Sequence, residues 1–344
     1  MSRESQTHWA EVALRLAAVL PAGRLHPAVN GWTDGAANRR WTVAFSGGAD
    51  SLALLLLVWA HWPERREGLV ALHFNHRLRG RAAVADAVFC RRVCVSLGVT
   101  FVSGEWVQAR KGAAEAEARA ARFEFFGHEL SRRRIKALWL GHQQDDIAET
   151  ALMRLARGSG TAGLAAPRPV QMMPGGRVHL RPLLTLKKRE VVRALTEAGA
   201  VWREDASNET KDYFRNRIRH AVLPEWIVAA GDRDALAGAA LSRELLDEDD
   251  AALEAWLEAL APLGADGRLD VRALACKPRA VVRRALYRWL ALQKDTGDLS
   301  RQGFALLLAM VEKGASTRFS LGRNGFAVIR KGRLFFEKAR LRHP

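Results

Sequence analysis

Cysteine is scarce in this 344-residue chain, and membrane-length apolar runs are missing from it. The three cysteines, Cys90, Cys94 and Cys276, include no CxxC pair, which argues against a disulfide framework and against a zinc or iron–sulfur site. The run SLALLLLVWAHW at residues 51–62 is too short to span a membrane. Because no signal-peptide pattern begins the sequence, we expect a cytoplasmic protein without a membrane partner.

Acidic residues are few relative to basic ones, since 37 Asp and Glu stand against 54 Lys and Arg, a formal charge of +17. Such a surplus favours a polyanionic partner, because each phosphate that the protein neutralises releases counterions. The alternative is a basic soluble protein with no such partner. An apolar fraction of 49% over this length predicts a globular chain with two domains.

Apolar runs alternate with helical patterns in the first half of the chain. Strands are expected at 41–45, 68–74, 99–103 and 135–141, and helices at 51–62, 81–97, 113–133 and 146–156. This alternation predicts an α/β domain with a parallel, Rossmann-like sheet, which we place at residues 41–225. Ligands bind such sheets at the carboxyl ends of the strands.

Two further regions flank that domain. Residues 1–40 are expected to be an N-terminal extension, with a short helix at 7–19 and a loop over 30–40. Residues 226–344 are expected to form a smaller α+β domain that is helical up to 313 and has short strands within 317–337.

The stretch VAFSGGADSL at 43–52 places an SGGxDS sequence between a buried strand and a helix. Glycines allow close backbone approach, and the amides of a helix N-terminus attract anions. Asp50 beside a phosphate requires a cation between them, so we expect Mg²⁺ together with ATP. The alternative is a plain glycine turn in which Ser51 caps the helix. The candidate ATP-binding residues of this loop are Ser46, Gly47, Gly48, Ala49, Asp50 and Ser51.

A second polar cluster is GHQQDDIAET at 141–150. Asp145, Asp146 and Glu149 are three or four residues apart, so a helix brings them onto neighbouring positions. Beside His142 and opposite the phosphate loop, they are candidates for catalysis, with Asp146 as a second metal ligand besides Asp50. Helix capping is the alternative for either aspartate alone.

Basic residues supply the remaining candidates. His73, in HFNHRLRG, follows the second strand, and it and His142 are candidates for contact with ATP. Arg119 and Arg122 share a helical face and suit phosphate oxygens, although surface ion pairing explains such a face equally well. Candidates for RNA contact, with a solvated helix face as the alternative, are Arg157, Arg181, Arg215, Asn216 and Arg219.

Taken in order, these stretches resemble the tRNA(Ile)-lysidine synthetase family of PP-loop ATP pyrophosphatases. The resemblance covers roughly residues 41–224 and runs through SGGxDS, H-x-N-H-x-L-R, A-R-x-x-R-Y, H-x-x-D-D-x-x-E-T, R-x-x-R-G-[ST]-G, R-P-L-L, E-D-x-S-N and R-N-x-I-R. The chain departs from this pattern at Phe123, where the family has Tyr, and at Gln143, where a second His is common.

The resemblance implies a reaction. ATP adenylates the C2 oxygen of the wobble cytidine in the CAU anticodon of tRNA(Ile), and the ε-amine of L-lysine then displaces AMP. It also implies that Asp50, Asp145, Asp146, Glu149, Arg119 and Arg122 act in catalysis, and that the second domain binds tRNA in a short form of the family. A homodimer is one oligomeric state that the sequence leaves open.

Two other functions are alternatives. A tRNA 2-thiolation enzyme would use the same adenylation, but such enzymes generally carry CxxC pairs, which this chain lacks. A basic RNA-binding protein without catalysis is the other, and the retained acids and serines argue against it.

Overall fold

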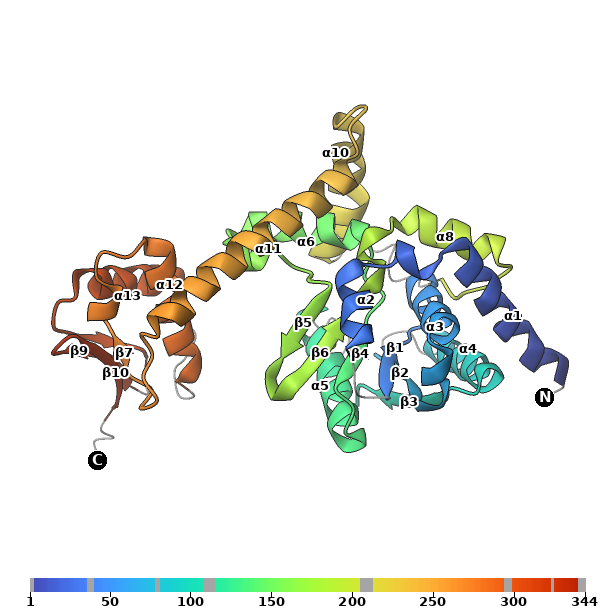
Figure 1. The fold of residues 1–344 in the computed structure, drawn as a ribbon, viewed down its shortest axis with the longest axis horizontal. Helices are drawn as coiled ribbons and strands as arrows, with labels where there is room; N and C mark the ends of the chain where they lie inside the picture. Colours follow the sequence, from blue (N-terminus) through green and yellow to red (C-terminus); the bar gives the residue numbers. More distant parts are fainter. Residues whose placement is uncertain are drawn as a thin grey trace. The chain divides into compact units, whose positions relative to one another are not determined.

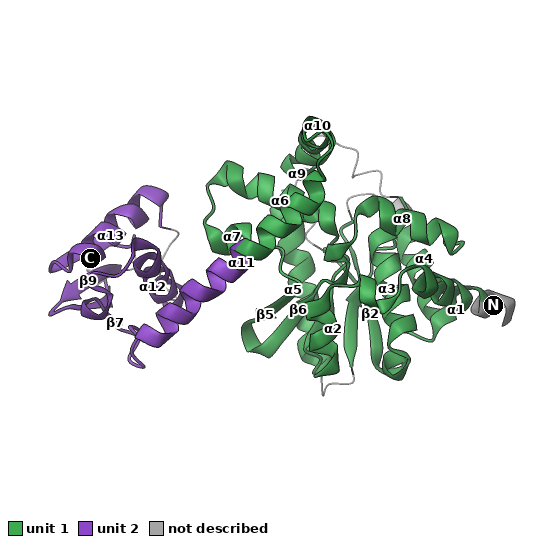
Figure 2. Ribbon diagram, turned by 45° about the horizontal axis from the view of Figure 1, so that its top comes forward, with its two compact units in different colours: residues 1–245 green, residues 246–344 purple. Residues whose placement is uncertain are grey.

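The computed structural model describes residues 3–35, 40–77, 81–107, 115–204, 213–293, 299–322 and 325–339. The chain divides into two compact units, residues 1–245 and 246–344, which Figure 2 shows in different colours. The division falls inside the long helix α11 (Ala235–Leu260), later in the chain than the boundary expected between residues 225 and 226. In the described ranges, no helix combines the length and the apolar character needed to cross a membrane.

Unit 1 is built on a six-stranded sheet with the order β3-β2-β1-β4-β6-β5 (Figure 1). Its strands are β1 (Trp41–Ala44), β2 (Leu69–Asn75), β3 (Thr100–Glu105), β4 (Ala137–Trp139), β5 (Val170–Met173) and β6 (Arg177–Leu180). All pair in parallel except β5, which runs antiparallel to β6. The predicted α/β class and its parallel strands are confirmed, and β5 and β6 form an additional hairpin.

The two faces of this sheet pack into different hydrophobic cores. In β2, Leu69 and Ala71 belong to the larger core, whereas Val70 and Leu72 belong to the smaller one. This division follows from the strand geometry, in which successive side chains point to opposite faces. Because both faces are covered, the strands appear in the sequence as continuous apolar runs.

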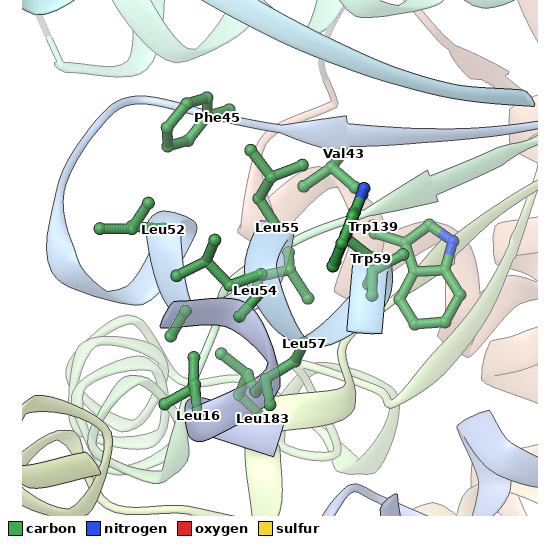
Figure 3. Packing of buried hydrophobic residues seen from close by; sticks show 14 of the residues in the cluster. Leu16, Val43, Phe45, Leu52, Leu54, Leu55, Leu57, Trp59, Trp139 and Leu183 are labelled. Carbon is green, nitrogen blue, oxygen red and sulfur yellow. The ribbon is translucent and has the colours of Figure 1, made fainter. Parts of the chain in front are cut away.

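The helix α3 (Ala49–His61) is buried along most of its length, since every residue from Leu52 to Trp59 is buried. A helix that is apolar all round needs neighbours on every side. One neighbour is α1 (Arg3–Val19), whose Leu16 lies in the same core as Leu54 and Leu57 (Figure 3). The N-terminal extension is therefore part of the core of unit 1.

The prediction of a loop over residues 30–40 is wrong for its first part, because that part belongs to α2 (Pro27–Asp34). Pro27 occupies the first helical turn, where its missing N–H costs nothing, and His26 Nδ1 accepts a hydrogen bond from Ala28 N–H (3.2 Å). Residues 36–39 of the expected loop lie outside the described residues.

The described part of unit 1 contains further helices. They are α4 (Arg81–Leu97), α5 (Glu115–Arg133), α6 (Gln144–Arg157), α7 (Thr161–Leu164), α8 (Lys188–Glu197), α9 (Phe214–Arg217), the π-helix η6 (Ile218–Val222) and α10 (Leu223–Ala229). Short 3₁₀ turns connect some of the elements: η1 (Ala22–Arg24), η2 (Pro63–Gly68), η3 (Pro174–Gly176) and η4 (Pro182–Thr185). Both α3 and α6 begin where a strand ends, at the carboxyl edge of the sheet.

Unit 2 combines helices with a four-stranded antiparallel sheet in the order β7-β10-β9-β8. Its core contains Trp289, Leu307 and Leu334. Its elements after α11 are β7 (Leu269–Asp270), the 3₁₀ turn η7 (Arg272–Leu274), α12 (Arg279–Leu292), α13 (Arg301–Lys313), β8 (Thr317–Ser320), β9 (Gly325–Arg330) and β10 (Arg333–Lys338). The short strands expected within 317–337 are confirmed, but β7 is a further short strand inside the stretch that was expected to be helical up to 313.

Candidate active site

The SGGxDS loop leaves β1 and enters α3 in a shape that depends on glycine. Gly47 has a φ of +93°, a conformation that L side chains rarely adopt, and a Cβ atom there would come within 3.1 Å of Cys90 Sγ. Serines fix the turn: Ser46 N–H donates to Ser51 Oγ (3.1 Å), and Ser51 Oγ donates to the Gly48 carbonyl oxygen (3.0 Å). The turn places the amides at the start of α3 at the strand end, where an anion can bind them.

A second close approach joins this loop to the end of β4. A Cβ atom on Gly141 would lie 2.9 Å from the Asp50 carbonyl oxygen, so only glycine allows the two segments to pack this closely. Since β1 and β4 are neighbouring parallel strands, both carboxyl ends lie at one edge of the sheet. The phosphate loop and the acid cluster after Gly141 therefore meet there.

Asp50 occupies an unusual electrostatic position. Its Oδ1 atom is buried and has no hydrogen-bond partner in the part of the chain that the structure describes. Burial, and then the charge of Asp146, raises the pKa of Asp50 to about 6, while Lys188 opposes this change. A buried carboxylate oxygen without a partner is well suited to receive a cation.

The helix α6, which carries the acid cluster, begins with a capping box. Gln143 N–H donates to Asp146 Oδ2 (2.9 Å), and Asp145 N–H donates to Gln143 Oε1 (2.6 Å). Asp145 Oδ2 in turn accepts from Lys188 N–H (2.8 Å) at the start of α8. Burial raises the pKa of Asp145, and the hydrogen bond from Lys188 works against this rise. Capping therefore accounts for part of what Asp146 does.

Glu149, only 1% exposed, lies between two arginines that follow it by more than sixty residues. Arg215 Nε donates to Glu149 Oε2 (2.7 Å), and Arg219 Nε donates to Glu149 Oε1 (2.6 Å). Arg215 also donates to Asp146 Oδ1. Burial lowers the pKa of Arg219, but its hydrogen bonds and charge interaction with Glu149 outweigh burial and raise it. Asp146 and Glu149 therefore form one network with these two arginines, in which each of the two carboxylates has a counter-charge.

His142 is held in its neutral form beside this network. Arg181 Nε donates to His142 Nδ1 (3.1 Å), and Arg181 also donates to the Arg168 carbonyl oxygen (2.7 Å). Burial, and then the charges of Arg181 and Arg215, lowers the pKa of His142 well below 6.5. Since Nδ1 accepts a hydrogen bond, the ring carries its proton on Nε2. His142 can therefore donate one hydrogen bond from Nε2 without carrying charge.

Arg119 and Arg122 act on the same histidine from α5, because their charges also lower its pKa. Both guanidinium groups lie over the ring of Phe123, at 4.9 and 5.6 Å from the ring centroid. An aromatic face attracts and orients a guanidinium group. Phe123, which departs from the family pattern, can thus position two arginines without a hydroxyl group.

The other predicted residues are more scattered. His73 is buried, and its Nδ1 lies 3.0 Å from the Phe45 carbonyl oxygen, so it links the ends of β2 and β1. Arg181 and Asn216 are only 5% and 8% exposed, whereas Arg157 is exposed in the last turn of α6. Residues 205–208 of the E-D-x-S-N motif lie outside the described residues.

Two basic residues at this edge were not singled out from the sequence. The charge of Lys188 lowers the pKa of Asp50. Arg203 N–H donates to the Gly47 carbonyl oxygen (3.0 Å), and Arg203 Nε pairs with buried Asp86 (2.9 Å). Both lie in stretches that carried family motifs, but only their position in the fold distinguishes them from nearby basic residues.

The site can be tested for its fit to Mg²⁺. Across the described residues, no group of three or more His, Cys, Asp or Glu side chains is arranged to hold a metal ion. Asp50 offers an unpartnered oxygen, whereas both oxygens of Asp146 accept hydrogen bonds, from Gln143 and Arg215. Mg²⁺ beside a nucleotide needs only one or two carboxylates, because the phosphates supply further oxygens. The residues present therefore fit Mg²⁺ bound together with ATP.

Comparisons with known proteins identify the family of the chain. A family model described as a PP-loop domain matches residues 24–226. The tRNA(Ile)-lysidine synthase of Geobacter sulfurreducens is 37% identical over 277 residues, which cover 77% of this chain and 57% of that protein. The tRNA(Ile)-lysidine synthase of Solibacter usitatus is 36% identical over 284 residues, which cover 80% and 62%. The chain thus spans about three fifths of the length of these relatives.

The chain also resembles a solved structure, and this likeness concerns the fold alone. A U34-tRNA thiolase from Methanococcus maripaludis superimposes with a TM-score of 0.53 at 16% sequence identity, over 69% of this chain and 78% of that one.

Proposed function

We propose that this chain, which belongs to the PP-loop domain family, is an ATP-dependent ligase. It joins L-lysine to C2 of the wobble cytidine in the CAU anticodon of tRNA(Ile). The observation that carries the proposal is the meeting of a phosphate-binding loop and a buried acid cluster at one sheet edge. The similarity to two enzymes named tRNA(Ile)-lysidine synthase supports this acceptor.

In the first step, the C2 oxygen of the cytidine attacks the α-phosphorus of ATP, and pyrophosphate leaves. The amides of Gly47 and Gly48 and the N-terminus of α3 are suited to hold the leaving pyrophosphate. Negative charge develops on the phosphate oxygens, so the arginines around His142 stabilise it.

Asp50 would hold Mg²⁺ through its unpartnered Oδ1 atom. When bound, the ion neutralises charge on the phosphates and positions them for in-line displacement. Asp146 as a second ligand stays a prediction, since both of its oxygens already accept hydrogen bonds.

In the second step, the ε-amine of lysine attacks C2, and AMP leaves with its oxygen. The amine must first be held as an ammonium group and then lose a proton. Asp146 and Glu149 are paired with arginines, whereas Asp145 bonds to the Lys188 amide. We therefore assign Asp145 to the ammonium group of lysine, and its raised pKa suits a carboxylate that accepts the proton.

The buried cysteines weigh against thiolation. Burial raises the pKa of Cys90 and raises that of Cys94 to about 12. A sulfur carrier needs an accessible thiolate, which these two residues do not provide near neutral pH.

The test is the transfer of labelled lysine. The protein is incubated with a tRNA(Ile) transcript, Mg²⁺-ATP and labelled L-lysine, and the label in the tRNA is counted. We expect incorporation that requires ATP, and none into a transcript whose wobble cytidine is replaced. Turnover of ATP without label in the tRNA contradicts the proposal, and sulfur incorporation from a persulfide donor would favour thiolation.

A further inference from the structure

Unit 2 carries an exposed aromatic stack outside the site described above. Tyr287 on α12 and Phe304 on α13 have ring centroids 4.2 Å apart and ring planes inclined by 19°. Tyr287 is nevertheless 55% exposed. Phe304 covers one face of the tyrosine ring, and more than half of the surface of the tyrosine stays accessible. A flat apolar ring supported from behind can stack with another planar group.

The charge around this stack is positive. Arg283 precedes Tyr287 by one helical turn, and Arg301 lies at the start of the helix that carries Phe304. Both arginines are exposed, and within the described part of unit 2 neither forms an ion pair. On an adjacent face of α12, Arg284 and Arg288 pair with acids of α11.

The last part of the chain carries most of the net positive charge. Residues 261–344 contain 18 Lys and Arg against 6 Asp and Glu, a surplus of 12 out of the +17 of the whole chain. A surface with unpaired arginines and an open aromatic face fits a polyanion that also offers planar rings. Single-stranded nucleic acid has both properties, because its bases can stack while its phosphates meet the arginines.

We propose that Tyr287, supported by Phe304, is a platform on which an unpaired base of an RNA stacks, with Arg283 and Arg301 contacting the adjoining phosphates. The identification of that RNA as tRNA rests on the proposed function, whereas the stacking of a base does not. A second copy of this chain fits the patch less well, because two such surfaces would bring like charges together.

The test compares two substitutions of Tyr287 in the full chain. Y287F keeps the ring, whereas Y287L keeps apolar bulk and helix propensity but removes the ring. Binding is measured to a short single-stranded RNA and to a blunt RNA duplex of the same length. We expect Y287L to weaken single-strand binding by about 5-fold to 100-fold, Y287F to bind like the original protein, and neither to change duplex binding much.

Salt dependence separates stacking from charge. Y287L is expected to lower affinity equally at all salt concentrations, whereas R283Q reduces the slope of log affinity against log salt by about one. L306A, which alters another exposed residue of α13, is the matched surface control and is expected to change neither. Thermal unfolding of each variant checks that unit 2 remains folded.

Several outcomes would overturn the proposal. They are equal single-strand affinity for Y287L and Y287F, an equal loss on the duplex, or a change in sedimentation with unchanged RNA affinity, which would indicate a contact between copies. Lysine transfer is assayed separately. Failure of transfer with an intact Tyr287 effect refutes the proposed function alone, whereas transfer without a Tyr287 effect refutes the platform alone.

Discussion

Replacing Asp50 with Asn is expected to stabilise the ligand-free protein while it abolishes ATP turnover. Burial and the charge of Asp146 raise the pKa of Asp50 from the ordinary 3.8 to about 6. A carboxyl group whose pKa is higher in the folded state is harder to ionise there, so its charge destabilises the fold. The shift corresponds to about 3 kcal/mol at pH 7 and above, which the neutral amide of D50N removes.

The gain in stability of D50N should increase with pH. Well below pH 3.8 the carboxyl group is neutral in both the folded and the unfolded states, so D50N and the original protein should be equally stable there. The cost of ionisation grows as the pH rises from about 4 to about 6 and is complete above that window. D50N should therefore gain several degrees in Tm at pH 7.5 and much less at pH 4.

The assay is thermal and urea unfolding in EDTA, without ATP, at a series of pH values. D232N is the matched control, because Asp232 is exposed and its replacement should change stability by less than about 0.5 kcal/mol. A D50N variant that is less stable than the original protein at pH 7.5, or whose gain does not vary with pH, refutes the reasoning about Asp50.

Three further predictions concern the ion pairs of Glu149, the packing of Gly141 and the burial of the cysteines. E149Q should lose about 3–5 kcal/mol of stability, because it leaves two partly buried arginines short of a counter-charge, and urea unfolding measures this; stability within 1 kcal/mol of the original contradicts the network. G141A should raise the KM for ATP, since the added Cβ would lie 2.9 Å from the backbone that opens α3, and an unchanged KM would show that the loop tolerates displacement. Iodoacetamide should label exposed Cys276 in the native protein long before it labels Cys90 and Cys94, as peptide mass mapping would show; equal rates contradict their burial.

The sequence predicted the parts of this molecule that depend on short stretches. The turn from β1 into α3 follows from the glycines of SGGxDS, and the start of α6 follows from its acids. The hairpin of β5 and β6 was also signalled, by apolar residues on both sides of a Pro-Gly-Gly turn at residues 174–176, but the two short strands were not predicted.

Contacts between segments that lie far apart in the chain could not be predicted from the sequence. Arg215 and Arg219 look like residues of a basic surface, yet they bond to Glu149, 66 and 70 residues earlier in the chain. His73 was predicted to contact ATP, and the structure places its buried ring beside the Phe45 carbonyl oxygen. Burial and pairing of this kind depend on how helices and strands pack, which local patterns do not determine.

The proposed ligation of lysine to tRNA(Ile) is tested by the stoichiometry of the reaction and by the position of the lysine in the tRNA. AMP, pyrophosphate and tRNA-bound lysine are quantified in one reaction, and the nucleosides of the digested tRNA are identified by mass spectrometry. We expect one AMP and one pyrophosphate for each lysine, with the lysine attached at the wobble cytidine and nowhere else. Release of ADP and phosphate, or lysine attached at another nucleotide, would contradict it.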